Sequence, residues 1–394
     1  MGAFRTIIRE CYYIYRLFKQ DIKIFPWKAI YHFSPIQQNK IVFICYNGKN
    51  YSCNPKYIAE EIMAQKLDYD LVWLLNDVTQ TLPEQIRKVP FQGKEALHEL
   101  ATAKVIITNI KNDLRVIKKK GQYVIQTWHG SYSSKILEKD AADKLPARYI
   151  KESKKNSRQT DLFLSNSKTL SQEYREAFWC DCEILECGFP RNDILFSWDP
   201  EVRARVRETF HLPKESRLVL YAPTFRDNGS TEAYSIDGHG ALKALENSGD
   251  DWHFLVRMHP NVSADQNLFS YDEKVLNATN YPDMQELLLA ADILITDYSS
   301  TVFEFAVLKK PSYIYAPDVE EYQKMRGLKA DFFKMPYAVN RTNAQLQAQL
   351  KNYTPEAGRE AAVQFMDFFG GVDKGDASKQ VVARIRNVIE EKYE

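Results

Sequence analysis

No apolar run in this sequence approaches the roughly 18 residues that a membrane-spanning helix needs. The N-terminus also lacks the pattern of a secretory signal peptide, because charged residues interrupt each of its apolar runs. The formal net charge is only +1 at pH 7, so no overall field favours nucleic acid as a partner. We therefore expect neither a transmembrane helix nor a cleaved leader nor a nucleic-acid ligand.

Several signatures of cofactor and metal binding are absent as well. No GxGxxG follows a predicted strand, which disfavours a dinucleotide cofactor, and the lack of GxxxxGK(S/T) excludes a P-loop enzyme. No Asp and His grouping has a convincing metal-ligand spacing. We expect no cofactor and no bound metal, and a Mg²⁺ ion held loosely with a substrate stays open as an alternative.

The six cysteines are scattered and include no CxxC pair. Cys180, Cys182 and Cys187 lie close together in the sequence, but no histidine follows at a spacing typical of a metal site. We interpret all six as reduced thiols in a cytoplasmic protein.

What is present predicts two α/β domains. At 394 residues the chain exceeds one typical core, and 44% hydrophobic residues allow large buried interiors. Short apolar runs rich in Val, Ile and Leu alternate with helical patterns, which favours doubly wound parallel sheets. We predict strands at 41–45, 70–75, 105–108, 123–127, 162–165, 183–186, 217–222, 252–258, 293–296 and 311–315. The apparent break at 188–190 predicts a linker near residues 190–200, with a ligand cleft between the two halves.

The first 33 residues differ in character from the rest. They carry six basic residues against two acidic ones, together with several interfacial aromatic residues. One face of the predicted helix is apolar, and Arg5, Arg9 and Arg16 fall nearly opposite it. Such a basic amphipathic helix indicates a peripheral membrane contact. The alternative is a helix packed on the first domain with its charges solvated.

The chain is organised around residues 291–305. An apolar strand there turns through Thr296, Asp297, Ser299, Ser300 and Thr301 into a helix. A strand that ends in hydroxyl residues before a helix presents backbone N–H groups and the positive end of the helix dipole, which suits a phosphate. The alternative is an ordinary turn with a serine N-cap.

Three further polar motifs follow strands and would face the same cleft. They are Trp128-His129-Gly130, residues 222–226 with Thr224 and Arg226, and Arg257-Met258-His259-Pro260. Two arginines and two histidines beside a hydroxyl-rich helix start predict a pyrophosphate site, with one histidine left as a base. Taken singly, a His after a strand is more often a capping or buried hydrogen-bonded residue, and an Arg is more often a surface charge.

In combination these motifs resemble the CDP-glycerol glycerophosphotransferase family, the TagB/TagF-like enzymes of teichoic acid and capsule assembly. The matching stretches occur in the family's order over about residues 45–330. They are 48–56, 126–130, 188–193, 221–226, 257–260, 292–304 and 315–322.

The resemblance implies a GT-B-like α/β fold, in which two Rossmann-type doubly wound domains face each other across a cleft. We place an amphipathic segment at 1–36, an acceptor domain at 37–195 and a CDP-donor-binding domain with a terminal helix at 196–394. The implied reaction moves glycerol phosphate, or another polyol phosphate, from a CDP-activated donor to a hydroxyl of a lipid-linked acceptor or polymer, and releases CMP.

The resemblance also implies roles for single residues. His129 and His259 would be the essential histidines, with His129 deprotonating the acceptor hydroxyl. His259 and Arg257 would contact the donor phosphates, and Glu304 the ribose. The other implied substrate contacts are Gly130, Ser131, Arg191, Asn192, Thr224, Arg226, Thr296, Asp297, Ser299, Ser300 and Thr301.

An acceptor held in a membrane would place the enzyme on the cytoplasmic face of the membrane as a peripheral protein. Basic runs at 118–120 and 151–158 would add contacts to anionic lipid or polymer, unless they are simply solvated surface. Two rival functions stay open, namely a GT-B glycosyltransferase that uses a nucleotide sugar and a non-catalytic polymer-binding protein. These residues do not decide three questions: whether the donor is CDP-glycerol or CDP-ribitol, whether the enzyme is a primase or a polymerase, and whether the product is wall teichoic acid or capsule.

Overall fold

The structure is a computed structural model, and it describes residues 26–111, 118–132, 134–143, 145–226, 231–259 and 268–390. Most of the predicted amphipathic segment therefore lies outside the described residues, and of that segment residues 26–32 are seen as a helix. Within the described ranges, no helix is both long enough and apolar enough to cross a membrane.

The N-terminal half of the chain forms a seven-stranded sheet in the order β3-β2-β1-β4-β5-β6-β7. Neighbouring strands in this sheet pair in parallel. Its strands are β1 (Gln37–Ile44), β2 (Asp70–Leu75), β3 (Ile86–Pro90), β4 (Ala103–Thr108), β5 (Tyr123–Gln126), β6 (Leu162–Ser165) and β7 (Glu183–Glu186).

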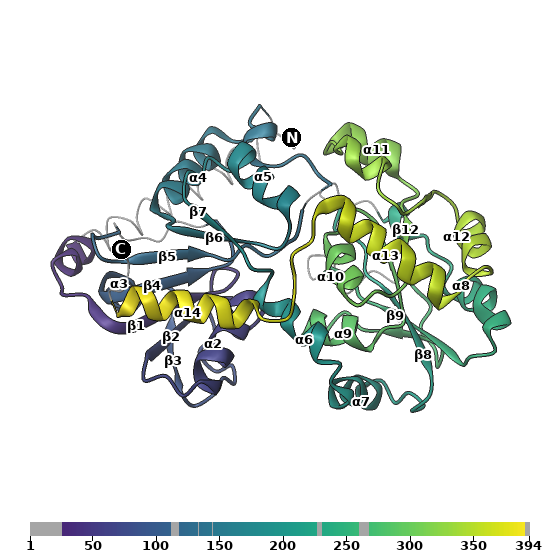
Figure 1. Cartoon of the computed structure of the whole chain (residues 1–394), viewed down its shortest axis with the longest axis horizontal. Coiled ribbons are helices and arrows are strands. Elements are labelled where there is room, and N and C mark those ends of the chain that lie inside the picture. Colours follow the sequence, from purple (N-terminus) through teal and green to yellow (C-terminus); the bar gives the residue numbers. More distant parts are fainter. Residues whose placement is uncertain are drawn as a thin grey trace, which may run out of the picture.

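The C-terminal half forms a second parallel sheet of six strands, in the order β10-β9-β8-β11-β12-β13. Its strands are β8 (Arg217–Tyr221), β9 (Trp252–Val256), β10 (Val275–Asn277), β11 (Ile293–Thr296), β12 (Ser312–Tyr315) and β13 (Val339–Asn340). Figure 1 shows the two sheets side by side.

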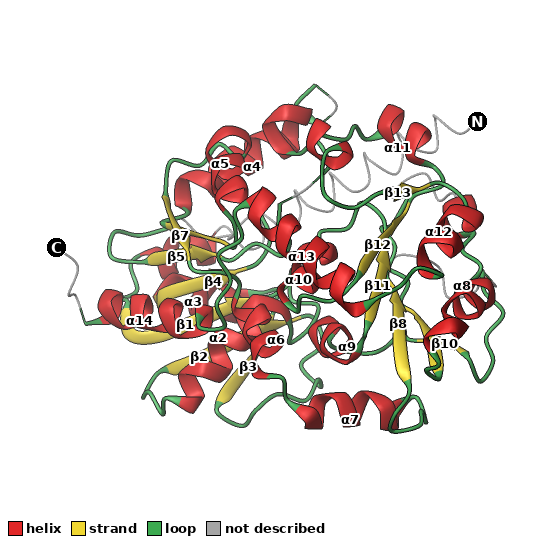
Figure 2. Cartoon of the chain, turned by 45° about the vertical axis from the view of Figure 1, so that its right-hand side comes forward, coloured by secondary structure: helices red, strands yellow, loops and turns green. Residues whose placement is uncertain are grey.

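Helices surround both sheets, as Figure 2 shows. Those in the first half of the chain are α2 (Cys53–Ala64), α3 (Lys94–Thr102), α4 (Ala147–Gln159), α5 (Lys168–Ala177), η1 (Glu138–Ala141), η2 (Pro190–Asn192) and α6 (Asp193–Ser197). Those in the second half are α7 (Pro200–Thr209), α8 (Gly238–Leu245), α9 (Met284–Ala290), α10 (Thr301–Val307), α11 (Val319–Met325), α12 (Asn343–Leu350), α13 (Pro355–Phe369) and α14 (Ala377–Ile389), with short 3₁₀ turns η3 (Glu232–Tyr234), η4 (Glu246–Ser248) and η5 (Ala330–Phe333).

The central strands are buried, which explains their composition. β4 and β11 are buried along their whole length, and such strands in parallel sheets read as continuous apolar runs. The prediction of an α/β fold with parallel sheets is confirmed. In each sheet the strand order reverses beside its first strand, at β1/β4 and at β8/β11. Open α/β sheets bind ligands outside the carboxyl ends of strands at such a point.

The end of the chain returns to the first sheet. α13 packs against α10 of the second half, whereas α14 packs against α2 of the first half. In Figure 1 both helices are yellow, and a single extended segment joins them across the molecule. Residues 377–389 therefore lie with the first sheet, although the predicted boundary groups them with the second.

The cysteine prediction was wrong in one respect. Cys180 and Cys182 are paired as a disulfide, with their Cα atoms 5.5 Å apart, inside the range that the bond requires. Cys45, Cys53 and Cys187 are free and buried, which agrees with their interpretation as reduced thiols.

Candidate active site

His129 lies just beyond the carboxyl end of β5, held by the backbone around it. Its Nδ1 is 2.7 Å from the main-chain oxygen of Asn109, and because a carbonyl only accepts, Nδ1 carries the proton. Nε2 then presents its lone pair. Burial, with smaller contributions from nearby Arg191 and Lys135, lowers the pKa of His129 to about 4. The imidazole is therefore neutral at pH 7 and can accept a proton.

Asn54, at the start of α2, anchors the backbone that leads into His129. Its amide donates to the main-chain oxygens of Thr127 and Trp128 at 3.2 and 3.1 Å, and its side-chain oxygen accepts from the backbone N–H of Arg191 at 3.1 Å. Trp128 takes a positive φ of 53°, a backbone conformation that needs support from its surroundings. These bonds supply that support immediately before the histidine.

The polar loop of the first sheet touches the hydroxyl turn of the second. A Cβ added at Gly130 would lie 3.1 Å from Oγ of Ser300, so glycine allows the two loops to meet closely. Next to this contact, the hydroxyls of Ser299 and Thr301 lie 2.8 Å apart at the start of α10. All three hydroxyl residues are half-buried and face partly to solvent. The structure thus brings two of the predicted motifs together.

The structure also brings Arg191 and Glu304 together, and these two residues pair with each other. Arg191 on η2 donates from Nη1 to the main-chain oxygen of His129 at 2.8 Å, and its Nη2 pairs with Glu304 on α10 at 2.5 Å. The second carboxylate oxygen of Glu304 accepts from the Gln285 amide. Burial raises the pKa of Glu304, and the Arg191 charge opposes that rise.

Arg226, a predicted donor contact, is enclosed within the second half. Its guanidinium pairs with Asp297 at 2.8 Å and with Asp318 at 2.7 Å, and only 1% of its side chain is exposed. Asp297 also accepts from the backbone N–H of Thr224 at 2.8 Å, and the Thr296 hydroxyl donates to a main-chain oxygen at the end of β8 at 2.7 Å. These predicted site residues thus bond one another, and the Thr224 hydroxyl is buried without a hydrogen-bond partner.

His259 and Arg257 follow β9. Arg257 donates from Nη1 to the main-chain oxygens of Tyr281 at 2.5 Å and Ala278 at 3.3 Å, whereas His259 lies near cations of the first half. The exposed His259 ring stands 5.6 Å from the Phe225 ring. Partial desolvation of this ring, followed by the charges of Lys135, Lys49 and Arg257, lowers the pKa of His259. Lys135 therefore contributes positive charge near both candidate histidines. Pro260 lies outside the described residues.

Ser131 and Asn192 are predicted substrate contacts that the structure buries. The Ser131 hydroxyl accepts from the Asn166 amide at 2.8 Å, and Asn192 donates to Asp373 at 3.1 Å. Only 2% of Ser131 and none of Asn192 is exposed. Both belong to an internal hydrogen-bond network rather than to the surface of the site.

Several residues of the site were missed from the sequence. Lys49 and Lys135 carried a usable signal, because each is a cation in the connection that follows a strand of the first sheet, β1 for Lys49 and β5 for Lys135. The amides and acids that hold the loops carried none, since their partners lie far away along the chain. They are Asn109, Asn166, Gln285 and Asp373. Asp318 falls within the matching stretch 315–322 but was given no role there.

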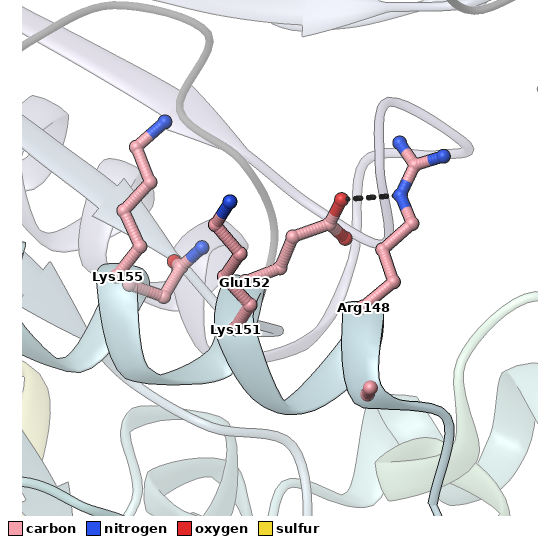
Figure 3. A pocket seen from close by; sticks show the side chains of 6 residues that line it. Arg148, Lys151, Glu152 and Lys155 are labelled. Atoms are coloured by element: carbon pink, nitrogen blue, oxygen red, sulfur yellow. Dashed lines mark hydrogen bonds and ion pairs between the residues drawn. The ribbon is translucent and has the colours of Figure 1, made fainter.

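A separate hollow of about 550 Å³ lies along α4. Figure 3 shows Arg148, Lys151 and Lys155 projecting from the same side of that helix, with Arg148 paired to Glu152 at 2.8 Å. Two of the predicted anionic-contact residues, Lys151 and Lys155, line it. Elsewhere among the described residues, no three or more His, Cys, Asp or Glu side chains form a group that could hold a metal ion.

Fold and site together define an α/β protein whose neutral histidine lies near cationic side chains, an arrangement typical of transferases with anionic substrates. The family model for CDP-Glycerol:Poly(glycerophosphate) glycerophosphotransferase matches residues 27–387, and the chain belongs to this family of enzymes. The resemblance drawn from the motifs is confirmed.

Named relatives agree with this membership. The chain is 33% identical over 374 residues to a teichoic acid poly(glycerol phosphate) polymerase of Staphylococcus epidermidis, covering 90% of this chain and 52% of that protein. It is 32% identical to the polymerase of the same name from Bacillus spizizenii, covering 89% and 93%. The chain thus spans about half of the first relative and nearly all of the second.

Solved structures of the wall teichoic acid polymerase TagF share the fold. One superposes with a TM-score of 0.83 at 29% identity and covers all of both chains. Another, a histidine-to-asparagine variant soaked with CDPG, superposes with a TM-score of 0.84 and covers all of this chain and 99% of that one.

Proposed function

We propose that this protein transfers glycerol phosphate, or another polyol phosphate, from a CDP-activated donor to a hydroxyl of a lipid-linked acceptor or growing polymer in teichoic acid biosynthesis. The observation that carries the proposal is His129, which is neutral, has its Nδ1 proton fixed by Asn109, and lies where the two halves meet. Family membership supplies the donor class.

The chemistry follows from the groups at hand. Nε2 of His129 takes the proton of the acceptor hydroxyl as that oxygen attacks the phosphorus bearing the polyol. The bond between this phosphorus and the bridging oxygen breaks, and its electron pair leaves with CMP. Positive groups near the phosphates favour this movement of charge, because they neutralise the leaving group as it forms.

We assign the donor phosphates to groups that reach the junction. His259 and Arg257 follow β9, and the charges of Lys49 and Lys135 from the first half act on His259. The hydroxyls at 299–301 lie across from Gly130 and add neutral donors.

We assign positioning roles to the predicted contacts whose polar groups are both buried and engaged with other protein groups. Glu304 and Arg191 hold each other and the His129 loop. Arg226 holds Asp297 beside Asp318, and so shapes the loop after β8 without reaching the phosphates. Ser131, Asn192 and Thr296 likewise support their loops.

We further propose a GT-B arrangement, in which residues 37–195 form an acceptor domain and residues 196–376 a donor domain. Three features support it: both sheets are doubly wound, the candidate histidines come one from each half, and the His129 loop meets α10 at their junction. α14 is assigned to the first domain because it packs on α2.

The acceptor side is proposed to lie at the cytoplasmic face of the membrane, with the protein bound peripherally. The cationic face of α4 is a candidate contact for anionic lipid or polyol-phosphate polymer. A Lys151→Glu, Lys155→Glu variant should bind less to vesicles containing anionic lipid, with no change on neutral vesicles. Equal binding of variant and wild type would remove α4 from the contact.

The deciding experiment incubates purified protein with CDP-glycerol, then with CDP-ribitol, and a synthetic lipid-linked saccharide. CMP release and product mass are measured together. We expect CMP and a product heavier by one or more polyol phosphates, and the number added separates primase from polymerase. His129→Asn should abolish both signals, because asparagine keeps a donor toward Asn109 and lacks a base in place of Nε2.

A matched control is His211→Asn. His211 is an exposed residue with a positive φ of 53°, a conformation that asparagine tolerates well, so turnover should not change. Release of a nucleoside diphosphate from a nucleotide sugar would indicate a glycosyltransferase instead. No nucleotide release with any donor would leave a polymer-binding protein.

A further inference from the structure

The segment that joins α13 to α14 carries an acid with no role in the mechanism so far. It leads the chain from the second sheet back to the first, and Asp373 lies in its middle, half-buried. Figure 1 shows this segment as the extended yellow stretch between the two helices.

Asp373 accepts hydrogen bonds from two separate loops of the first half. Its Oδ1 accepts from the backbone N–H of Phe189 at 2.9 Å and from the Asn192 amide at 3.1 Å. Its Oδ2 accepts from the Asn166 amide at 3.0 Å. A carboxylate only accepts, so three donors directed at it form a complementary set.

The same Asn166 amide continues the network to the active loop. It donates to Oγ of Ser131 at 2.8 Å, and Ser131 directly follows Gly130, where an added Cβ would lie 3.1 Å from Oγ of Ser300. Asp373 is therefore two hydrogen bonds away from the loop that carries His129.

The chain makes room for this acid. Gly188 has a positive φ of 89°, and a Cβ there would lie 2.8 Å from Oδ1 of Asp373. A side chain at that position would displace the carboxylate, so the glycine serves the close approach.

Resting on the transferase function proposed above, we infer that Asp373 is a positioning residue for the reaction. Through Asn166 and Ser131 it fixes the loop of His129 against the start of α10. Because Asp373 belongs to the segment between α13 and α14, this fixation requires the C-terminal return of the chain to be in place.

The test exchanges the two partners. Asn166→Asp places two carboxylates face to face, so the loop should shift and kcat should fall by about tenfold or more while KM for CDP-glycerol changes little. The double variant Asn166→Asp, Asp373→Asn restores the pair: the new amide donates to the new carboxylate, which accepts from the Ser131 hydroxyl. Its kcat should recover most of the loss.

Asp376→Asn is the matched control, because Asp376 lies in the same segment and, among the described residues, its carboxylate accepts a hydrogen bond from exposed Gln380 alone, at 2.9 Å. Urea unfolding of all variants separates loosening of the segment from misplacement of the loop. Three results would overturn the inference. The first is a kcat that falls across the variants only in proportion to their urea unfolding midpoints. The others are a loss of kcat in Asp376→Asn equal to that in Asn166→Asp, and a double variant whose kcat does not recover. A wild-type protein that releases no CMP overturns the proposed function and the inference with it, whereas turnover that Asn166→Asp leaves unchanged overturns the inference alone.

Discussion

Arg191 and Glu304 form an ion pair at 2.5 Å that joins the two halves of the molecule, with 7% and 5% of their side chains exposed. Arg191 comes from η2, which follows the first sheet, and Glu304 from α10 of the second half. The same guanidinium donates to the main-chain oxygen of His129 at 2.8 Å. One buried pair thus connects the packing of the halves to the position of the candidate base.

Glu304→Gln should destabilise the fold and lower kcat together. The substitution leaves the Arg191 charge buried without its counter-charge, which costs about 3–5 kcal/mol in free energy of unfolding. Urea unfolding and CMP release measure the two effects. Replacing both partners, with Arg191→Met and Glu304→Leu, should cost less stability than the sum of the single losses.

Glu152→Gln provides the comparison, because Glu152 pairs with Arg148 at the surface, where 47% of the glutamate and 53% of the arginine are exposed. Exposed pairs contribute about 0–1 kcal/mol, so this variant should unfold close to wild type. A Glu304→Gln variant with unchanged stability and a raised KM for the donor would instead favour a direct ribose contact.

Arg226 and Arg257 should behave differently although both follow strands of the second sheet. Arg226→Met leaves Asp297 and Asp318 buried without their cation, so the free energy of unfolding should fall by about 3 kcal/mol or more. The Arg226→Met molecules that do fold should keep a nearly unchanged KM for CDP-glycerol.

Arg257→Met should act on donor binding instead. A charge-assisted hydrogen bond to a phosphate contributes about 1.5–3 kcal/mol, so KM for CDP-glycerol should rise by roughly tenfold or more. Steady-state kinetics at several protein concentrations, with unfolding curves beside them, distinguish the two arginines. The assignment is contradicted if Arg226→Met raises KM and leaves stability intact.

Gly130→Ala should lower kcat because its Cβ would stand 3.1 Å from Oγ of Ser300. Close contacts of this kind force small shifts that cost about 1–3 kcal/mol. In a Ser300→Ala background the oxygen is gone, and Gly130→Ala should then cost less. A double-mutant cycle on kcat should give a coupling of about 1 kcal/mol, and simple additivity would show that the two loops do not touch during turnover.

The strands and the strand-end motifs could be predicted because both are local. Strands 70–75, 162–165, 183–186 and 293–296 lie where the apolar runs place them. The short edge strands β10 and β13 were missed, since three and two residues carry too little pattern. β3 was missed because Arg87 and Lys88 interrupt it and a proline ends it.

Partners distant in the sequence could not be predicted. Arg226 carries the same local signal whether it binds a phosphate or an acid, and only the fold places Asp318 beside it, 92 residues later. The return of α14 to the first sheet has the same cause, because an amphipathic helix does not encode which sheet it covers. The Cys180–Cys182 bond depends on a local backbone bend that cysteine spacing alone does not reveal.

The pH dependence of turnover should identify His129 as the base. Its pKa is lowered to about 4, chiefly by burial, so kcat/KM should stay level from pH 7 down through 6 and fall only as pH approaches 4. An unperturbed histidine would already be half protonated near pH 6.5. An acid limb centred near pH 6.5 would therefore point away from His129 and toward an exposed imidazole.

The free energy of unfolding should also depend on the protonation of His129, and it should fall as the pH falls. The pKa of His129 is lower in the folded protein than in the unfolded chain, so the unfolded state takes up a proton first as pH falls. The stabilising contribution of neutral His129 is complete above about pH 6.5 and is lost as pH falls toward 4. In His129→Asn this contribution is absent, so the stability difference between wild type and variant should shrink between pH 6.5 and 4. Urea unfolding of both proteins across that range measures the difference, and a constant difference would mean that the imidazole is not buried as a neutral base.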